Sequence, residues 1–186
     1  MKIATMAVLL AFMLTGCDTG NDALNHAMDL RKRILEAQEC RFQSAVTADY
    51  GENIYTFQMD CVVDSSGTLE FTVTDPQTIA GITGRITDSY ASLIYEDKIL
   101  AFPMLADATL TPVSAPWIFI NTLRSGYITG CGEEKDGLCL YIDDSYEENP
   151  LHLQIHTDEI ANPVSAEIIW KDRRILSLDI RNFTIQ

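Results

Sequence analysis

Side chains that could do catalytic chemistry are few and scattered in this sequence. No GxSxG, HExxH, P-loop or GxGxxG pattern is present. His152 and His156 alternate with apolar residues and share one face of an expected strand. Four residues of strand hold them roughly 13 Å apart, too far to chelate one metal ion as a pair. We expect two surface histidines, no catalytic or metal-binding residues, no cofactor and no enzymatic activity.

An acidic cluster lies between two expected strands. Asp143-Asp144 and Glu147-Glu148 flank Ser145-Tyr146. Carboxylates at this density could hold calcium or dock a basic partner, but the ligand spacing and glycine of an EF-hand loop are missing. We therefore expect a solvated loop.

The N-terminal residues have the layout of an export signal. Lys2 supplies a positive charge, and residues 3–14 are apolar apart from Thr5. This apolar run is too short to span a bilayer. The segment that ends it, Leu14-Thr15-Gly16-Cys17, resembles the lipobox of bacterial lipoproteins, which implies cleavage after residue 16 and acylation of Cys17. An ordinary secretory signal with another cleavage site is the alternative.

The lipobox resemblance divides the chain into three parts. Residues 1–16 would be a signal peptide, 17–21 a short tether, and 22–186 one domain. Two acyl chains anchor a protein stably where one does not, so the resemblance implies a protein held on the extracytoplasmic side of the cell membrane. In envelopes with two membranes, an aspartate in the place of Asp18 tends to accompany retention on the inner one.

The chain is strongly acidic. Removing residues 1–16 takes away one positive charge, Lys2, and leaves a formal charge near −15, compared with −14 for the full 186 residues. Such a domain will not seek nucleic acid or anionic headgroups. Its length suits a single domain with its own core.

Four cysteines follow Cys17, and an even number in an exported domain favours disulfides. If Tyr50-Gly51 is a two-residue hairpin loop, Cys40 lies opposite Cys61 at a non-hydrogen-bonded position, with Cα atoms about 4.5 Å apart. The same register places Cys40, Phe42, Val46, Tyr55, Phe57 and Met59 on one face. A bridge between Cys131 and Cys139 would clamp a second hairpin. We expect both bridges to be structural.

Two helices are expected. Residues 22–38 carry an apolar stripe of Ala27, Leu30, Ile34 and Ala37, which Leu24, Met28 and Leu35 widen, with Asp22 as the N-cap. The basic run 31–33 could touch anionic lipid or be a solvated helix side, and we favour the second. Residues 111–126 begin with Pro112 and Pro116 and are apolar nearly all round, which predicts a buried helix.

The remainder alternates with the period of strands. About ten strands are expected, including 40–48, 54–64, 69–74, 82–95, 99–105, 127–132, 137–143 and 175–185, with a short helical turn from Asp75-Pro76 to Gly81. Many antiparallel strands with few helices predict a mainly β, α+β domain whose curved sheet closes over a core. The apolar residues that could line a cavity inside it, or form its plain core, are Phe42, Phe57, Phe71, Trp117, Ile118 and Phe119.

This order of elements resembles the LolA-like half-barrel proteins. The resemblance rests on the front helix, the apolar insertion around Trp117, and the last strands, Ala166-Glu167-Ile168-Ile169-Trp170 followed by 175–183. It implies a strongly bent antiparallel sheet with the apolar helix in its concave side. Similar lipoproteins include clostridial germination lipoproteins that act as partners of a cortex-processing amidase. The anchor at Cys17 departs from the soluble periplasmic carriers, which puts shuttling across an envelope in doubt.

Two functions remain open at this point. The first is a non-enzymatic accessory lipoprotein that binds another envelope protein, with spore germination or cortex processing as a setting. The alternative is a lipid- or acyl-chain-binding protein of the lipoprotein-carrier type. A cavity filled by Trp117, Ile118 and Phe119 would exclude the alternative.

Overall fold

The structure is a computed structural model that describes residues 19–96, 98–101, 105–106 and 109–186. Within these residues, one continuous antiparallel sheet has the order β6-β5-β4-β3-β2-β1-β13-β12-β11-β10-β9. Its strands are β1 (Glu39–Asp49), β2 (Ile54–Asp64), β3 (Leu69–Asp75), β4 (Thr83–Ile86), β5 (Ala91–Tyr95), β6 (Lys98–Ala101), β9 (Tyr127–Glu134), β10 (Gly137–Asp143), β11 (His152–Thr157), β12 (Pro163–Trp170) and β13 (Arg173–Ile185). A separate pair is formed by β7 (Leu105–Ala106) and β8 (Thr109–Leu110).

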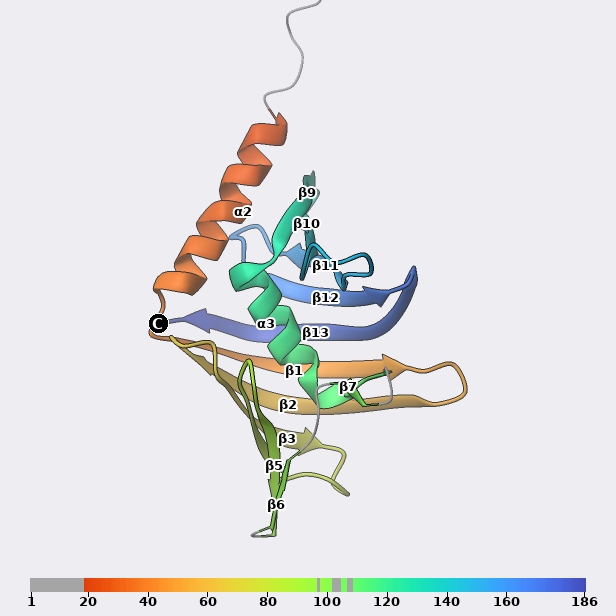
Figure 1. Ribbon diagram of the computed structural model, residues 1–186. Helices are drawn as coiled ribbons and strands as arrows, with labels where there is room; N and C mark the ends of the chain where they lie inside the picture. The colour runs from red at the N-terminus through yellow and green to blue at the C-terminus, as the bar shows by residue number, and fades with distance from the viewer. Residues whose placement is uncertain (1–18, 97, 102–104, 107–108) are drawn as a thin grey trace, which may run out of the picture.

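The sheet bends around a helix without closing on itself (Figure 1). β1 pairs with both β2 and β13, so the first and last strands meet at the middle of the sheet. β6 and β9 are its two edges, and all four residues of β6 are exposed. The expected mainly β half-barrel is therefore confirmed, with 13 strands among the described residues in place of about ten.

Helix α3 (Ala115–Ser125) fills the concave side and follows a short 3-10 helix, η1 (Pro112–Ser114). Pro116 lies in the first turn, where its missing N–H has no partner to lose. Residues 115–120 are all buried, as the nearly all-round apolar pattern predicted. The ring of Phe119, 0% exposed, meets Phe42 of β1 edge to face with centroids 5.8 Å apart. α3 is thus part of the core.

Helix α2 (Thr19–Glu36) begins earlier than expected, so Asp22 lies in its first turn instead of capping it. It contacts β9, β10 and α3 along one narrow stripe that holds Ala23, Ala27, Leu30 and Ile34. The expected wider face is wrong, because Leu24, Met28 and Leu35 are between 42% and 49% exposed.

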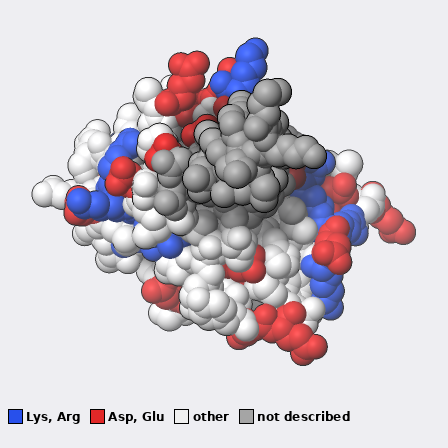
Figure 2. Space-filling model, turned by 90° about the horizontal axis from the view of Figure 1, so that it is seen from above, with Lys and Arg blue, Asp and Glu red and all other residues white. Residues whose placement is uncertain are grey.

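The basic run of α2 is only partly in solvent. Arg31 Nε donates a hydrogen bond to the Leu123 carbonyl of α3 at 2.7 Å, and burial lowers the pKa of its guanidinium. Arg33 reaches Asn162, while Lys32 is exposed near Glu36. Figure 2, which looks down from above the view of Figure 1, shows basic and acidic side chains interspersed over the visible described surface. Arg31 therefore joins the two helices.

The β1–β2 hairpin has a different register from the one that predicted a disulfide. The loop spans Tyr50 to Asn53, where Tyr50 N donates to the Asn53 carbonyl at 3.0 Å. This longer loop shifts the pairing by two residues and places Cys40 opposite Val63, and Phe42 opposite Cys61. Both cysteines are buried free thiols. The expected face survives because a shift of two residues keeps every side chain on its side of the sheet.

The β9–β10 hairpin also lacks the geometry of a bridge. Its register pairs Cys131 with Leu140, and Cys139 with Gly132. Directly opposed residues share a face, so the two cysteine side chains point to opposite faces. Cys131 donates a hydrogen bond to the Ala23 carbonyl of α2 at 3.2 Å, and both cysteines are free. Burial raises the pKa of Cys40, Cys61 and Cys131, which keeps these thiols protonated and poorly reactive.

Three other expected segments differ in whole or in part. The single strand over 82–95 is two strands, because Thr87 folds the chain back: Thr87 Oγ1 accepts the Tyr90 N–H at 3.1 Å. Residues 76–81 form turns instead of a helical turn, closed by the Gly81 N–H to the Val73 carbonyl at 2.9 Å. The expected strand 99–105 begins within β6 (Lys98–Ala101), and its residues 102–104 lie outside the described part of the chain. None of the described helices is long and apolar enough to cross a membrane.

Candidate functional site

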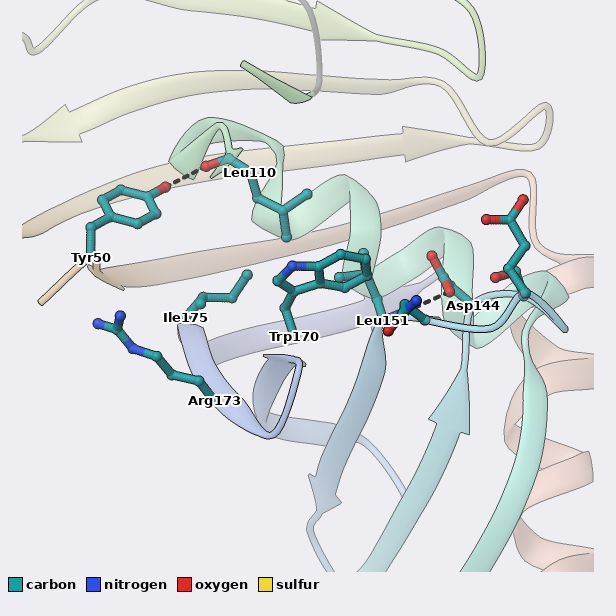
Figure 3. A pocket seen from close by; sticks show the side chains of 10 residues that line it. Tyr50, Leu110, Asp144, Leu151, Trp170, Arg173 and Ile175 are labelled. Atoms are coloured by element: carbon teal, nitrogen blue, oxygen red, sulfur yellow. Dashed lines mark hydrogen bonds between the residues drawn. The ribbon is translucent and has the colours of Figure 1, made fainter. Parts of the chain in front are cut away.

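A pocket of about 440 Å³ opens at one end of the half-barrel (Figure 3). Three parts of the chain that are distant in sequence form it: the β1–β2 loop, the segment before η1, and the region from β10 to β13. Its lining residues are Tyr50, Leu110, Asp144, Ser145, Glu147, Asn149, Leu151, Trp170, Arg173 and Ile175. A volume of this size lies within the ~300–1,000 Å³ range of small-molecule and side-chain binding sites.

The walls of the pocket are mainly apolar. Trp170, the last residue of β12, lies at the centre in Figure 3, with Leu110, Leu151 and Ile175 around it. Trp170 is half-buried, so part of its ring is available to a ligand. Lys171 Nζ lies 5.5 Å from the centre of the Trp170 ring, within the range of a cation–π contact. This arrangement suits a flat or branched apolar group.

Tyr50 holds one wall of the pocket, the segment around Leu110, in place. Its hydroxyl donates a hydrogen bond to the Leu110 carbonyl, as Figure 3 shows. Burial, with a smaller effect of Tyr55, raises the pKa of Tyr50, so the hydroxyl keeps the proton that it donates. Gly51 follows at φ +89°, a conformation that favours glycine, beside the Arg173 guanidinium. The hairpin loop thereby holds the segment before η1 in place.

Charged groups surround the mouth. Arg173 Nη2 lies 3.1 Å from both the carboxylate and the carbonyl oxygen of Asp49. Asp144 accepts the Leu151 N–H at 2.8 Å and so closes the loop between β10 and β11. Glu147 makes no hydrogen bond or ion pair with any described residue. The mouth therefore carries one acidic group free to meet a basic one.

The structure splits the acidic cluster that the sequence suggested. Asp144 and Glu147 line the pocket, whereas Asp143 pairs with His152 at 2.7 Å on the outer face of the sheet. His156 pairs with a different carboxylate, Glu134, at 2.8 Å. The two histidines thus have separate partners, and in the described part of the chain the carboxylates of the cluster do not gather around one point that could hold calcium.

None of the six residues that could have lined a cavity borders the pocket. Their exposed fractions run from 0% to 6%, and they belong to one hydrophobic core: Phe42, Phe57, Phe71, Trp117, Ile118 and Phe119. The concave side is therefore filled where α3 packs, and the open space lies beyond its N-terminal end. Cys17, the lipidation site expected from the sequence, lies outside the described residues.

Sequence reasoning missed the pocket residues because no motif or spacing connects them. Tyr50, Leu110 and Trp170 lie on segments that are 60 residues or more apart. The one available signal was an aromatic residue at the end of an otherwise alternating strand, directly before the charged run Lys171-Asp172-Arg173-Arg174. A Trp at the end of a strand is partly exposed more often than a Trp at the centre of a strand.

No protein-family model matches the sequence, and no curated protein matches it. Solved structures with a similar arrangement include a DUF1329 family protein from Desulfovibrio piger, at 8% identity and TM-score 0.48, with 91% of this chain and 94% of that chain covered. A LolA superfamily protein from Nitrosomonas europaea is 7% identical, with TM-score 0.43 and coverage of 86% and 93%. The lipoprotein LppX from Mycobacterium tuberculosis is 13% identical, with TM-score 0.41 and coverage of 87% and 93%. Likenesses this weak give no information about binding or activity.

Proposed function

We propose that this protein is a membrane-anchored, extracytoplasmic accessory lipoprotein that binds a segment of another envelope protein at the pocket around Trp170. The observation that carries the proposal is the position of α3. Because α3 fills the concave side with buried side chains, an extended acyl chain has no tunnel there. The open, mainly apolar pocket at the end of the sheet supports binding of another molecule there.

The chemistry of the pocket describes the segment that it would bind. Trp170 and its aliphatic neighbours can enclose one or two apolar side chains, and buried aromatic contacts of this kind carry most of the energy in small interfaces. Glu147, and the formal charge of −14 of the whole chain, favour a partner with basic residues beside that apolar anchor.

A variant in the pocket tests this binding. In protein purified from detergent-solubilised native membranes, we expect a stoichiometric envelope protein to accompany the wild type. Trp170→Ala should weaken that association about tenfold or more, the effect of removing an aromatic anchor. Tyr90→Ala, which removes a 48% exposed aromatic side chain from the turn between β4 and β5, is the matched control and should change nothing.

Two results would contradict the partner proposal. One is a wild-type preparation with no stoichiometric protein. The other is equal recovery of the partner with Trp170→Ala, provided that its thermal unfolding matches that of the wild type.

The anchor is proposed from the sequence and needs its own experiment. Cys17→Ser should abolish incorporation of fed palmitate and move the protein from the membrane to the soluble fraction, because the two acyl chains supply the hold on the bilayer. Cys131→Ser, which changes a thiol within the folded domain, should keep both the label and the membrane fraction. A wild-type protein that palmitate never labels would exclude lipidation.

Because Trp117, Ile118 and Phe119 fill the concave side, an acyl chain inside the half-barrel is excluded. Binding of an acyl chain at the pocket around Trp170 is the second candidate function, and the volume and apolar walls of that pocket favour it. Native mass spectrometry of protein purified from its own cells separates the two. A bound lipid that Trp170→Ala loses supports the second candidate, and a bound polypeptide supports the first.

The biological setting is proposed from the resemblance to clostridial germination lipoproteins. It makes an amidase that processes spore cortex the first partner to test. Neighbouring genes for cortex processing would support this setting, and neighbouring genes for lipid export would argue against it.

A further inference from the structure

Three side chains of the types that bind zinc meet on the face of the sheet turned away from α2 and α3. Cys139 of β10 lies directly opposite His156 of β11, and Glu134 ends the adjacent strand β9. One ligand atom from each residue lies within 4.8 Å of the other two. Cys139 is buried, His156 is half-buried and Glu134 is exposed, so the group opens to solvent on one side only.

Neighbouring polar groups hold the imidazole of His156 in place. His156 Nδ1 lies 2.8 Å from Glu134 Oε2, and Nε2 lies 3.1 Å from the amide nitrogen of Gln154. The same amide nitrogen is 3.6 Å from Cys139 Sγ. Gln154 therefore borders two of the three candidate ligands. Polar partners that fix the ring of a ligating histidine are a regular part of metal sites.

The sheet leaves room beside the thiol. The residue opposite Cys139 on β9 is Gly132, and a Cβ built there would meet no atom within 4 Å. The next residue on this face of β9 is Gly130, opposite Tyr141. Gly132 therefore leaves open space on the β9 side of Cys139, whereas Tyr141, on the same face of β10, makes a side-chain hydrogen bond with the thiol. An ion and its water ligand could occupy the space beside Gly132 once the thiolate gives up its contact with Tyr141.

We propose that Glu134, Cys139 and His156 bind one Zn²⁺, with water as the fourth ligand. Thiolate, imidazole and carboxylate together suit zinc, and a thiolate disfavours Mg²⁺ and Ca²⁺. Ligand atoms on a tetrahedral zinc lie roughly 3.3–3.8 Å apart. Glu134 Oε2 and His156 Nδ1 are already 2.8 Å apart, and because no pair exceeds 4.8 Å, none has to close by more than about 1 Å.

Charge around the site favours a cation. Glu133 precedes Glu134, and a shallow hollow of about 270 Å³ beside it is lined by Asp158, Glu159 and one cation, Lys135, so carboxylates outnumber basic groups there. This concentration of carboxylates raises the local concentration of divalent ions. The site lies on the opposite face of the sheet from α3, and it shares no residue with the pocket around Trp170. The zinc proposal therefore does not depend on the proposed partner binding, and each can be tested without the other.

Cobalt and zinc titrations of the purified full chain in detergent, with its thiols reduced, test the site. One equivalent of Co²⁺ should give a thiolate-to-cobalt charge-transfer band, and Zn²⁺ should displace it. Cys139→Ser and His156→Gln should abolish the band, while Glu134→Gln should weaken binding tenfold or more. Cys131→Ser and His152→Gln change the matched thiol and imidazole outside the group, and they should bind like the wild type.

A second measurement needs only the wild type. Zn²⁺ should protect Cys139 from alkylation, read by mass spectrometry of its peptide, and protection should fall as the pH is lowered, because protons compete for the thiolate and imidazole. The proposal is overturned if the wild type gives no charge-transfer band, if His152→Gln loses binding as fully as His156→Gln, or if Zn²⁺ leaves Cys139 as reactive as before.

Discussion

Phe119→Ala should lower the free energy of unfolding by about 3–5 kcal/mol, the usual cost of removing a fully buried aromatic ring. Phe119 is 0% exposed on α3, and its ring packs edge to face against Phe42. The curved sheet surrounds this position, so the space left by the ring cannot collapse without moving several strands. Urea unfolding of the wild type and the variant, followed by circular dichroism, measures the difference.

Ile99→Ala is the matched control for this change. It also removes a large apolar side chain, but Ile99 is 70% exposed on β6. The variant should stay within about 0.5 kcal/mol of the wild type, as surface substitutions do. A Phe119→Ala protein as stable as Ile99→Ala would show that α3 is not packed in the concave side.

Gly137→Ala should cost about 3 kcal/mol or more, through backbone contact as well as strain. A Cβ at Gly137 would lie 2.1 Å from the Thr157 carbonyl oxygen and 2.7 Å from that of Asp158. Gly137 also has φ +154°, a conformation that side chains rarely adopt. Backbone atoms cannot rotate out of the way as a side chain can. The start of β10 must therefore move away from the end of β11. Urea unfolding measures this loss as well.

Gly132→Ala tests the same hairpin without the contact. A Cβ there meets nothing within 4 Å, and we expect a change of less than about 1 kcal/mol. If Gly137→Ala were equally mild, the close approach of β10 to the end of β11 would be wrong.

Patterns that act over a few residues predicted most of the fold. The buried α3 followed from an apolar run with prolines at its start, and β1 and β2 followed from alternation. The hairpin register did not follow, because a shift of two residues leaves the buried face unchanged and alternation cannot detect it. A plausible cysteine pair then reinforced the wrong register. The width of the buried face of α2 depended on how much of the helix its neighbours cover.

The candidate sites could not be predicted for a related reason. The pocket joins Tyr50, Leu110 and Trp170, and the proposed metal group joins residues of three strands. Only the correct strand register brings such residues together. The spacing of histidines along one strand carries no signal of this group, because His156 meets its neighbours across strands. Cys139 also has a plausible disulfide partner in the sequence, which favours a structural role over a ligand role.

The open edge of the sheet matters more for a tethered molecule than for a free one. β6 pairs with β5 and with no other described strand, and Ile99 and Leu100 are 70% and 63% exposed beside its outward backbone groups. Such an edge is a template for a strand of a second molecule, and its short length and Lys98 oppose aggregation. Copies confined to a membrane plane collide laterally far more often than copies in bulk solution. If the protein is anchored as proposed, this short, charged edge would limit clustering at the membrane surface.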